Sequence, residues 1–351
     1  MENEGWELYV NTKPILKKGK FSVVLRANVA QNINTLTAMD ANVLESMNTD
    51  FDYANESVMS RVQVGHSLGA IYGFRYKGVY AYDYDHNGYF VNDDKNQYYT
   101  AGGEQNTAAA ALGRDHDAKL TAENAAPIAR DANGNVIYDK AGNPLQMIFD
   151  YGGNNYAFEG GDVCYEDVNK DGQINELDIC YLGSSNPKIN GGFGVDFTYG
   201  QWTLKTNFNF RIGNKIINLA KMYAEDMRAN RNQMASVAWR WRKNGDITEI
   251  PRAKSTAIEE SYNALISDRY VEPGDYLRFQ YFQIGYSVPA KKLKKVGLSS
   301  FRINASGNNI FCFTKYSGTD PEHTQSGYSP CYDSSQTPRS KSFTFSLNFG
   351  F

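Results

Sequence analysis

The chain has 351 residues, of which 41% are hydrophobic, 14% aromatic and 21% charged, and its formal net charge is −3. The aromatic content excludes a disordered chain, and the nearly balanced charge shows none of the basic excess that nucleic-acid binding requires. No stretch approaches the ~18 consecutive apolar residues of a membrane-spanning helix. The first six residues contain neither a basic nor an apolar segment, so we expect no signal peptide.

Strands with alternating apolar and polar residues dominate the sequence, because successive side chains of a strand point to opposite faces. Between residues 202 and 212 the even positions are mainly aromatic or aliphatic and the odd positions are polar. In the segment 276–288 the apolar phase switches from odd to even positions, which predicts a β-bulge. We expect about nine strands, near residues 6–12, 20–30, 58–67, 70–82, 191–199, 201–212, 275–288, 300–311 and 341–351.

This pattern fits a β-sandwich, which buries the apolar face against a second sheet, or a transmembrane β-barrel, which turns that face to lipid. Several strands run to ~10–12 residues, close to what a tilted strand needs to cross a bilayer. Short and long connections also alternate, as in outer-membrane barrels. The last strand is apolar at every second position up to the final residue, which we interpret as a C-terminal assembly signal carried by Phe343, Phe345, Leu347, Phe349 and Phe351.

The number of strands bears on whether the barrel is complete. Bacterial barrels normally have an even number of strands, and an open sheet edge in lipid leaves backbone groups unsatisfied. An odd count without a signal peptide therefore predicts that the chain is the C-terminal segment of a longer protein, all of it belonging to one barrel. We expect residues 83–189 and 213–273 to form long extracellular loops of that barrel.

The two long loops contain further predicted elements. Residues 106–130 are rich in alanine and predict a partly helical segment, and residues 131–144 predict a small hairpin with two Asn/Gly turns. Residues 219–243 have helical character. Within that last segment, Trp239 and Trp241 could stack on a sugar ring, although aromatic residues equally serve to pack a loop onto its neighbours.

Residues 167–178 match the spacing of a calcium-binding loop. Such loops supply oxygen ligands from positions 1, 3, 5, 7 and 12 and need glycine at position 6, which is Gly172 here. The predicted ligands are four side chains and one main-chain carbonyl, from Asp167, Asn169, Asp171, Gln173 (carbonyl) and Asp178. The alternative is a loop held by Asx turns without an ion. A weaker copy of the spacing occupies residues 83–94.

Catalytic motifs are missing from the sequence. The four histidines accompany no nucleophile signature, and the sequence has no phosphate-binding loop. The acidic pair Asp320 and Glu322 lies in a loop, where carboxylates are common, so we do not interpret it as a glycosidase pair. The four cysteines form no C-x-x-C pair. They either make two disulfides, for instance across the acidic loop, or pack unpaired as small apolar residues.

An ordered set of short motifs resembles the late part of SusC/RagA-type TonB-dependent transporters of the Bacteroidota. The matches run in family order across nearly the whole chain, and their combination is more specific than any one of them. They include Gly-rich residues 68–79, the acidic segment 160–183, residues 187–194, the Trp/Gly-Asp/Ile-Pro-Arg set at 241–252, residues 274–278, 284–289, 308–311, and the Thr-Lys-Tyr-Ser-Gly-Thr-Asp-Pro-Glu segment 314–322.

The resemblance implies a plugged barrel of roughly 22 strands. It also implies a SusD-like surface lipoprotein as a lid, and import of oligosaccharides or peptides with energy from TonB. This chain would contribute barrel wall and the loops that face substrate and lid, without enzymatic activity. Candidate contacts with substrate or lid are Trp239, Trp241, Asp320 and Glu322. The plug domain and the TonB box would lie in an N-terminal part that is absent from this chain. The implied location is the outer membrane, with the wall in contact with lipid.

Two other functions remain open at this point. The first is a secreted, calcium-stabilised β-sandwich that serves as an adhesin or carbohydrate-binding module, which predicts that Phe208, Phe210, Phe345 and Phe349 are buried against protein. The transporter hypothesis instead predicts that one alternating face meets lipid. The second, a glycan-degrading enzyme, needs a pair of carboxylates in a cleft and has little support in the sequence.

Overall fold

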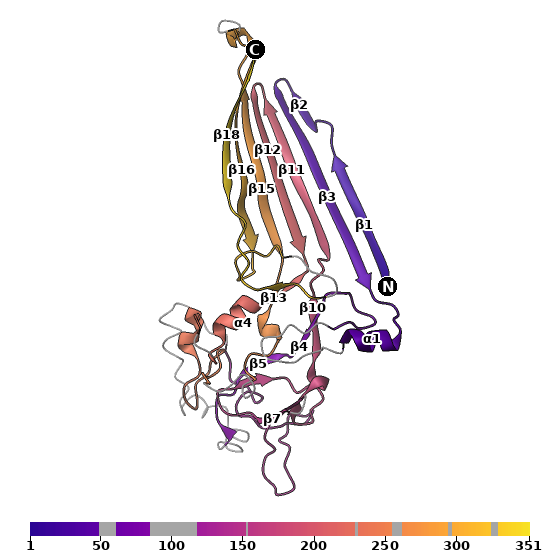
Figure 1. Ribbon diagram of the computed structural model, residues 1–351, viewed down its shortest axis with the longest axis vertical. Helices are drawn as coiled ribbons and strands as arrows, with labels where there is room; N and C mark the ends of the chain where they lie inside the picture. The colour runs from indigo at the N-terminus through magenta and orange to yellow at the C-terminus, as the bar shows by residue number, and fades with distance from the viewer. Residues whose placement is uncertain are drawn as a thin grey trace.

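A computed structural model describes residues 1–48, 61–84, 118–151, 154–228, 231–254, 262–293, 297–323 and 329–351. It shows a tall, twisted sheet with a body of loops at one end (Figure 1). We call these two parts the main sheet and the loop body. The loop body consists of the described residues between 36 and 188, between 213 and 275, and between 315 and 341.

The main sheet has eight antiparallel strands among the described residues. Its strand order is β1-β3-β11-β12-β15-β16-β18, and the short β2 pairs with β3. The strands are β1 (Glu2–Asn11), β2 (Leu16–Lys18), β3 (Phe21–Thr35), β11 (Ile189–Tyr199), β12 (Trp202–Ile212), β15 (Tyr276–Ser287), β16 (Ser300–Thr314) and β18 (Ser342–Gly350). Apart from β2, they are 9 to 15 residues long, so most have the length that crosses a bilayer.

The predicted antiparallel barrel wall is confirmed, with seven of the expected strands in the main sheet. The two strands expected at 58–67 and 70–82 do not join it. Residues 61–69 form no strand, and the rest of this stretch supplies only β4 (Ala70–Gly73) and β5 (Tyr76–Val79), which pair inside the loop body. Its alternating aromatic residues are buried in that body, so the period-two pattern indicated strands but not their partners.

One face of the main sheet is apolar and carries a ladder of aromatic rings. Phe193, Phe208, Phe279 and Phe311 are neighbours across four strands, with ring centroids 4.9, 4.5 and 5.3 Å apart. The predicted bulge in β15 is confirmed, because consecutive residues Asn207 and Phe208 of β12 pair with Tyr281 and Phe279, which leaves one extra residue in β15.

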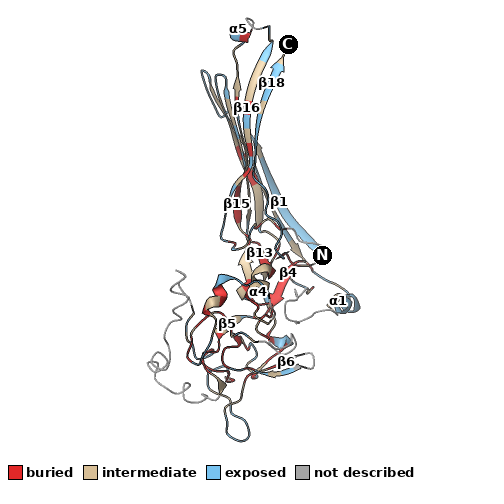
Figure 2. Cartoon of the chain, turned by 60° about the vertical axis from the view of Figure 1, so that its left-hand side comes forward, coloured by how far each residue is buried: buried red, intermediate tan, exposed pale blue. Residues whose placement is uncertain are grey.

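The apolar face is exposed at the C-terminal strand. Phe345 is 68% exposed and Phe349 is 53% exposed, and the strand appears pale blue along its length in Figure 2. The opposite face is polar and is crossed by pairs such as Arg26 and Asp196, whose charged atoms lie 2.6 Å apart. The sandwich alternative is wrong for this strand, because no second sheet covers the apolar face in the described part of the chain.

The loop body draws its core from segments that are distant in sequence. Phe74, Phe149, Phe158, Tyr165 and Leu265 pack in one cluster and are almost completely buried, as the red segments of Figure 2 show. Its further strands are β6 (Ile148–Tyr151), β7 (Asn154–Ala157), β8 (Val163–Tyr165), β9 (Gln173–Ile174), β10 (Cys180–Ser184), β13 (Lys215–Asn218), β14 (Val271–Pro273) and β17 (Tyr332–Asp333).

Helices are few and short. They are α1 (Ala41–Asn48), α4 (Leu219–Glu225), α5 (Ala290–Leu293) and the 3-10 helices η2 (Glu176–Asp178), η3 (Ala235–Trp239) and η5 (Asp268–Tyr270). In the described ranges, every helix is too short or too polar to span a lipid bilayer. The helix expected over 219–243 is therefore only partly correct, because α4 and η3 are separate short pieces.

Three smaller predictions can be compared with the structure. The hairpin over 131–144 is confirmed, because Asp131 and Asp139 each close a turn by accepting backbone N–H groups. The described part of the alanine-rich segment, residues 118–130, forms turns and bridges rather than a helix, and residues 106–117 lie outside the described residues. All four cysteines are free thiols, so the disulfide alternative is wrong.

Candidate functional site

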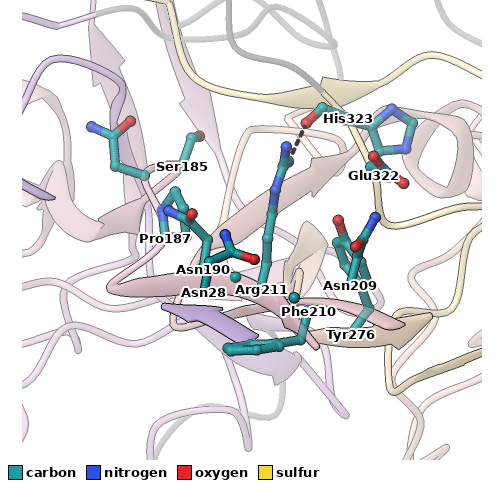
Figure 3. Close-up of a pocket in the computed structure, with 13 residues that line it drawn as sticks. Asn28, Ser185, Pro187, Asn190, Asn209, Phe210, Arg211, Tyr276, Glu322 and His323 are labelled. Carbon is teal, nitrogen blue, oxygen red and sulfur yellow. Dashed lines mark hydrogen bonds between the residues drawn. The ribbon is translucent and has the colours of Figure 1, made fainter. Parts of the chain in front are cut away.

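A polar cavity of about 510 Å³ lies where the polar face of the main sheet meets the loop body (Figure 3). The sheet contributes residues from β3, β11, β12 and the start of β15, and the loop body closes the other side. The residues on which the site depends are Asn28, Asn190, Asn209, Arg211, Glu322 and His323.

A glycine allows two asparagine side chains to approach each other on the cavity floor. Gly192 pairs with Asn28 on one neighbouring strand and with Asn209 on the other. A Cβ atom at Gly192 would lie 2.9 Å from the Oδ1 atom of Asn209 and 3.4 Å from that of Asn28. The same atom would lie 2.8 Å from the main-chain carbonyl of Phe208, so a side chain at this position would clash with the β12 backbone and with the Asn209 amide.

Arg211 carries the positive charge of the cavity. It lies beside Asn190 in the β11–β12 register. Its Nη1 donates a hydrogen bond of 3.1 Å to the main-chain carbonyl of His323, and Figure 3 shows the side chain reaching from the sheet toward that carbonyl. Among the described residues, no carboxylate lies within 4.0 Å of the guanidinium. The charge is thus held in place by a neutral group.

The floor asparagines also keep free hydrogen-bonding capacity. Within the described ranges, the side-chain amides of Asn28, Asn190 and Asn209 make no hydrogen bond. Each amide offers two N–H donors and one carbonyl acceptor. Asn186 differs, because its amide donates to the Leu68 carbonyl at 2.8 Å and so stabilises the loop body.

A buried arginine fixes the acidic wall of the cavity. Arg278 is 3% exposed and lies 2.5 Å from Asp320 and 3.3 Å from Glu322. It also donates a 2.5 Å hydrogen bond to Asn309, and Glu322 is additionally 3.0 Å from Arg339. The two acidic side chains predicted to contact substrate or lid thus already neutralise arginines inside the chain. Their contact with substrate or lid stays a prediction.

Behind the cavity, the His323 ring is buried against a second polar group. Its Nε2 lies 3.4 Å from an Asp333 oxygen, and Asp333 accepts a 2.8 Å hydrogen bond from the Tyr316 hydroxyl. Burial, together with the adjacent Asp333 carboxylate, raises the pKa of Tyr316 well above its usual value. The Tyr316 hydroxyl therefore stays protonated and continues to donate to Asp333.

The two predicted tryptophans pack within the loop body. Trp239 is 5% exposed and contacts Ile250 in a small apolar cluster. The Nε1 of Trp241 donates a 3.0 Å hydrogen bond to the Ala81 carbonyl, and its ring lies over Gly161. The packing interpretation accounts for these contacts, and stacking on a sugar ring stays a prediction.

The predicted calcium loop is curled around its acidic residues. The Asp167 carboxylate accepts hydrogen bonds from the backbone N–H groups of Lys170, Asp171 and Gly172. Asp178 accepts from Val168 and from Asn175, and it caps the helix η2. Asn169 and Asp171 bond to each other at 2.8 Å. Asx turns of this kind hold the loop together without requiring an ion.

The residue types of this loop are compatible with a hard cation, since carboxylate and amide oxygens are the ligands that Ca²⁺ prefers. Burial raises the pKa of Asp178 to about 6 and also raises that of Asp167. In the described part of the chain, no three acidic, histidine or cysteine side chains are grouped closely enough to hold a metal. The full five-ligand set, with its amide and carbonyl oxygens, stays a prediction. Most of the weaker copy at 83–94 lies outside the described residues.

Sequence reasoning missed the cavity itself. Asn209 and Arg211 belong to the polar odd positions of the segment 202–212, but a strand pattern does not show which positions lie beside a loop. The signal that could have indicated the site was the adjacent glycine pair in β11, Gly191 and Gly192, beside polar strand positions. Glycine inside a strand often marks a close approach of other groups.

The chain is similar over its whole length to known receptors. No protein-family model matches the sequence. The TonB-dependent receptor P39 of Formosa agariphila is 27% identical over 359 aligned residues, covering 100% of this chain and 30% of that protein. The TonB-dependent receptor P3 of the same organism is 24% identical and is covered over 29% of its length. The chain therefore spans about a third of the length of these curated relatives.

Solved structures share the fold. The RagAB peptide importer in its closed-closed state aligns with a TM-score of 0.61 and 16% identity, over 99% of this chain and 29% of that chain. The open-open state of the same importer aligns with a TM-score of 0.58.

The resemblance predicted from the motifs is confirmed as a similarity: over its whole length the chain resembles TonB-dependent receptors, and it shares the fold of part of the RagAB importer.

Proposed function

We propose that this chain forms part of the wall and the outer loops of a TonB-dependent importer in the outer membrane. The observation that carries the proposal is the contrast between the two faces of the main sheet. One face exposes aromatic residues such as Phe345, while the other carries charged and amide side chains that lead to the cavity. A wall between lipid and an aqueous lumen requires this contrast.

We propose that the loop body lies on the extracellular side. The strand connections at the opposite end are short, as at Gly200 between β11 and β12. The three long connections all fold into the loop body at the other end (Figure 1). Outer-membrane barrels have short periplasmic turns and long outer loops, which supports this orientation. In this arrangement the loops predicted at 83–189 and 213–273 are extracellular, the first of them extends back to residue 36, the connection 315–341 is a third, and the whole of 1–351 is one barrel segment.

The partners and cargo follow from the same proposal. The plug domain and the TonB box would come from an N-terminal part of the protein, and TonB would act through that part. A SusD-like lipoprotein would cover the loop body, and the cargo would be an oligosaccharide or a peptide. The likeness to the RagAB peptide importer supports a peptide, and the whole-chain likeness to TonB-dependent receptors supports energised import. We propose no bond chemistry for this chain, since its relatives are named as receptors and importers.

The proposal can be tested with the whole receptor in its own cell envelope. Affinity purification through a tag on the receptor, after outer membranes are solubilised in detergent, should recover a surface lipoprotein. Deleting the receptor gene should stop uptake of at least one labelled oligosaccharide or peptide, and dissipating the proton gradient should stop the same uptake. Uptake that is unchanged by both treatments, together with a receptor in the soluble fraction, would contradict the proposal.

We also propose that the loop at 167–178 binds Ca²⁺ as a structural ion. The support is the oxygen-rich spacing and the burial of Asp167 and Asp178. The ion would neutralise the two carboxylates and stiffen an exposed loop. Calorimetric titration of the calcium-stripped receptor with Ca²⁺ tests this, with Asp178→Asn as the variant that should lose the binding heat. Equal heats from both proteins would contradict it.

A further inference from the structure

We propose that Arg211 and the asparagines of the cavity floor form a subsite that binds a carboxylate group of the imported oligomer. This inference rests on the proposed import function and adds to it the chemical class of the cargo. A carboxylate occurs at the C-terminus of a peptide and on the uronic acid units of a glycan, so the shared chemistry is an acidic oligomer.

Arg211 has the properties of a carboxylate receptor. A guanidinium presents five N–H donors in a planar fork that matches a carboxylate with two parallel hydrogen bonds. In the described residues, Arg211 uses one donor, on the His323 carbonyl, and has no acidic partner. The bond to His323 fixes the side chain across the cavity (Figure 3). The fork is therefore held in place while most of its donors remain available.

The other arginine near the cavity provides an internal comparison. Arg278 is buried and surrounded by Asp320, Glu322 and Asn309, so its charge is neutralised within the chain. Glu322 lines the cavity, yet it is balanced by Arg278 and by Arg339. An incoming carboxylate would therefore meet the positive charge of Arg211 and an acidic wall that is already neutralised.

The asparagine amides on the cavity floor can form hydrogen bonds with the uncharged part of the same ligand. Asn28 and Asn209 converge over Gly192, and Asn190 lies beside Arg211. Amide side chains donate to and accept from hydroxyl groups as well as peptide groups. The cavity volume of about 510 Å³ lies within the range of ordinary ligand sites. The arginine would thus select the acid, and the asparagines would hold the unit that carries it.

The test uses the whole receptor, with its lipoprotein partner if one copurifies, and two matched pairs of probes. The first pair is an alanine pentapeptide with a free C-terminal carboxylate and its C-terminal amide. The second pair is a tetramer of galacturonic acid and its methyl ester. Calorimetry should show that at least one acidic probe binds about tenfold or more tightly than its neutral twin, since charge-assisted hydrogen bonds are the stronger ones. The pair that shows the preference identifies the source of the carboxylate.

Substitutions then assign the preference to this cavity. The acid preference is the dissociation constant of the neutral probe divided by that of the acidic probe. Arg211→Gln should reduce this ratio to nearly one. Arg211→Lys should retain part of the preference, because lysine keeps the charge but not the planar fork of N–H donors. Lys205→Gln is the matched control: Lys205 lies on the same face of β12, roughly 20 Å along the strand. It should keep the full preference. Asn209→Asp places a carboxylate on the cavity floor and should weaken binding of the acidic probe by charge repulsion. This second variant keeps the test decisive if the Arg211→Gln receptor does not assemble.

Two results would overturn the inference. One is an absence of acid preference in both probe pairs, and the other is a preference that survives Arg211→Gln and Asn209→Asp, whatever Lys205→Gln does. Failure of the inference is distinguishable from failure of the proposed function. If the receptor still imports a neutral probe in an energised cell, import stands and the acid subsite does not. If no probe of either pair is imported and no lipoprotein is recovered, import itself fails.

Discussion

The main sheet and the loop body are stabilised in different ways. The main sheet is two-sided: its strands pair with their neighbours, and large aromatic residues such as Phe343 and Phe345 remain exposed. The loop body has an interior in which Phe149 and Phe158 are fully buried, and buried ion pairs join distant segments. The difference shows that one chain can contain a sheet whose aromatic face is left uncovered and a body that encloses an apolar core.

The largest expected loss of stability comes from a substitution where the main sheet meets the loop body. Replacing Arg278 by methionine leaves Asp320 and Glu322 without their shared cation, and loss of one partner of a buried ion pair costs about 3–5 kcal/mol. We expect a clear fall in the unfolding temperature of the whole receptor in detergent. Arg26→Met is the control, because Arg26 pairs with Asp196 at an exposed position, where ion pairs contribute about 0–1 kcal/mol. Equal losses from the two variants would contradict the account.

Inside the loop body, Phe149→Ala should also be costly. Phe149 is completely buried and stacks on Tyr262 at 4.1 Å, and truncation of a buried phenylalanine costs about 3–5 kcal/mol. Limited proteolysis should cut residues of the loop body in this variant while the strands of the main sheet stay protected. Simultaneous loss of both regions would show that they are not separate folding units.

The two faces of the main sheet should respond in opposite ways to a charge. An arginine on a lipid-facing position costs about 2–4 kcal/mol at the bilayer midplane. We therefore expect Phe345→Arg to reduce the amount of heat-resistant, folded barrel in outer membranes, whereas Ser346→Arg, one residue on and facing the lumen, should assemble normally. Equal assembly of both variants would mean that the exposed aromatic face does not meet lipid.

The smallest expected effect is a pH dependence in the loop body. Burial raises the pKa of Asp178 to about 6 in the folded state, above its usual value of 3.8. The folded state then binds more protons than the unfolded state between these values, so calcium-free receptor should lose stability as pH rises from about 4 to 6. Unfolding temperatures in chelator across this range test the sign. Asp178→Asn should flatten the dependence, and stability that rises over the same interval in chelator would contradict the burial argument.

The sequence allowed the main sheet to be predicted better than the loop body, for a physical reason. A strand in a two-sided wall repeats every two residues, so the phases of β12 and β18 and the bulge in β15 could be recognised directly. In the loop body the same period appears in β4 and β5, but both faces are buried and their partners come from distant segments. Their placement depended on tertiary contacts that no local pattern records.

The candidate site was predictable only in part for the same reason. The acidic loop at 167–178 is local, so its spacing alone indicated a calcium-type loop or, as the alternative, a loop held by Asx turns, and the structure contains such turns. The cavity is not local, because it joins β3, β11 and β12 to residues 322–323 of the last long connection. The sequence places Asp320 and Glu322 in a loop as candidate contacts with substrate or lid, whereas the structure gives them a buried arginine as a partner.

The central claim is that the aromatic face of the main sheet contacts lipid and the polar face contacts water. The most direct measurement is site-directed spin labelling of the whole receptor in lipid bilayers, in a cysteine-free background, with labels at Phe345→Cys and Ser346→Cys. We predict that dissolved oxygen relaxes the label at 345 more strongly and that a water-soluble nickel chelate relaxes the label at 346 more strongly. The reverse order, or equal accessibility at both positions, would contradict the claim.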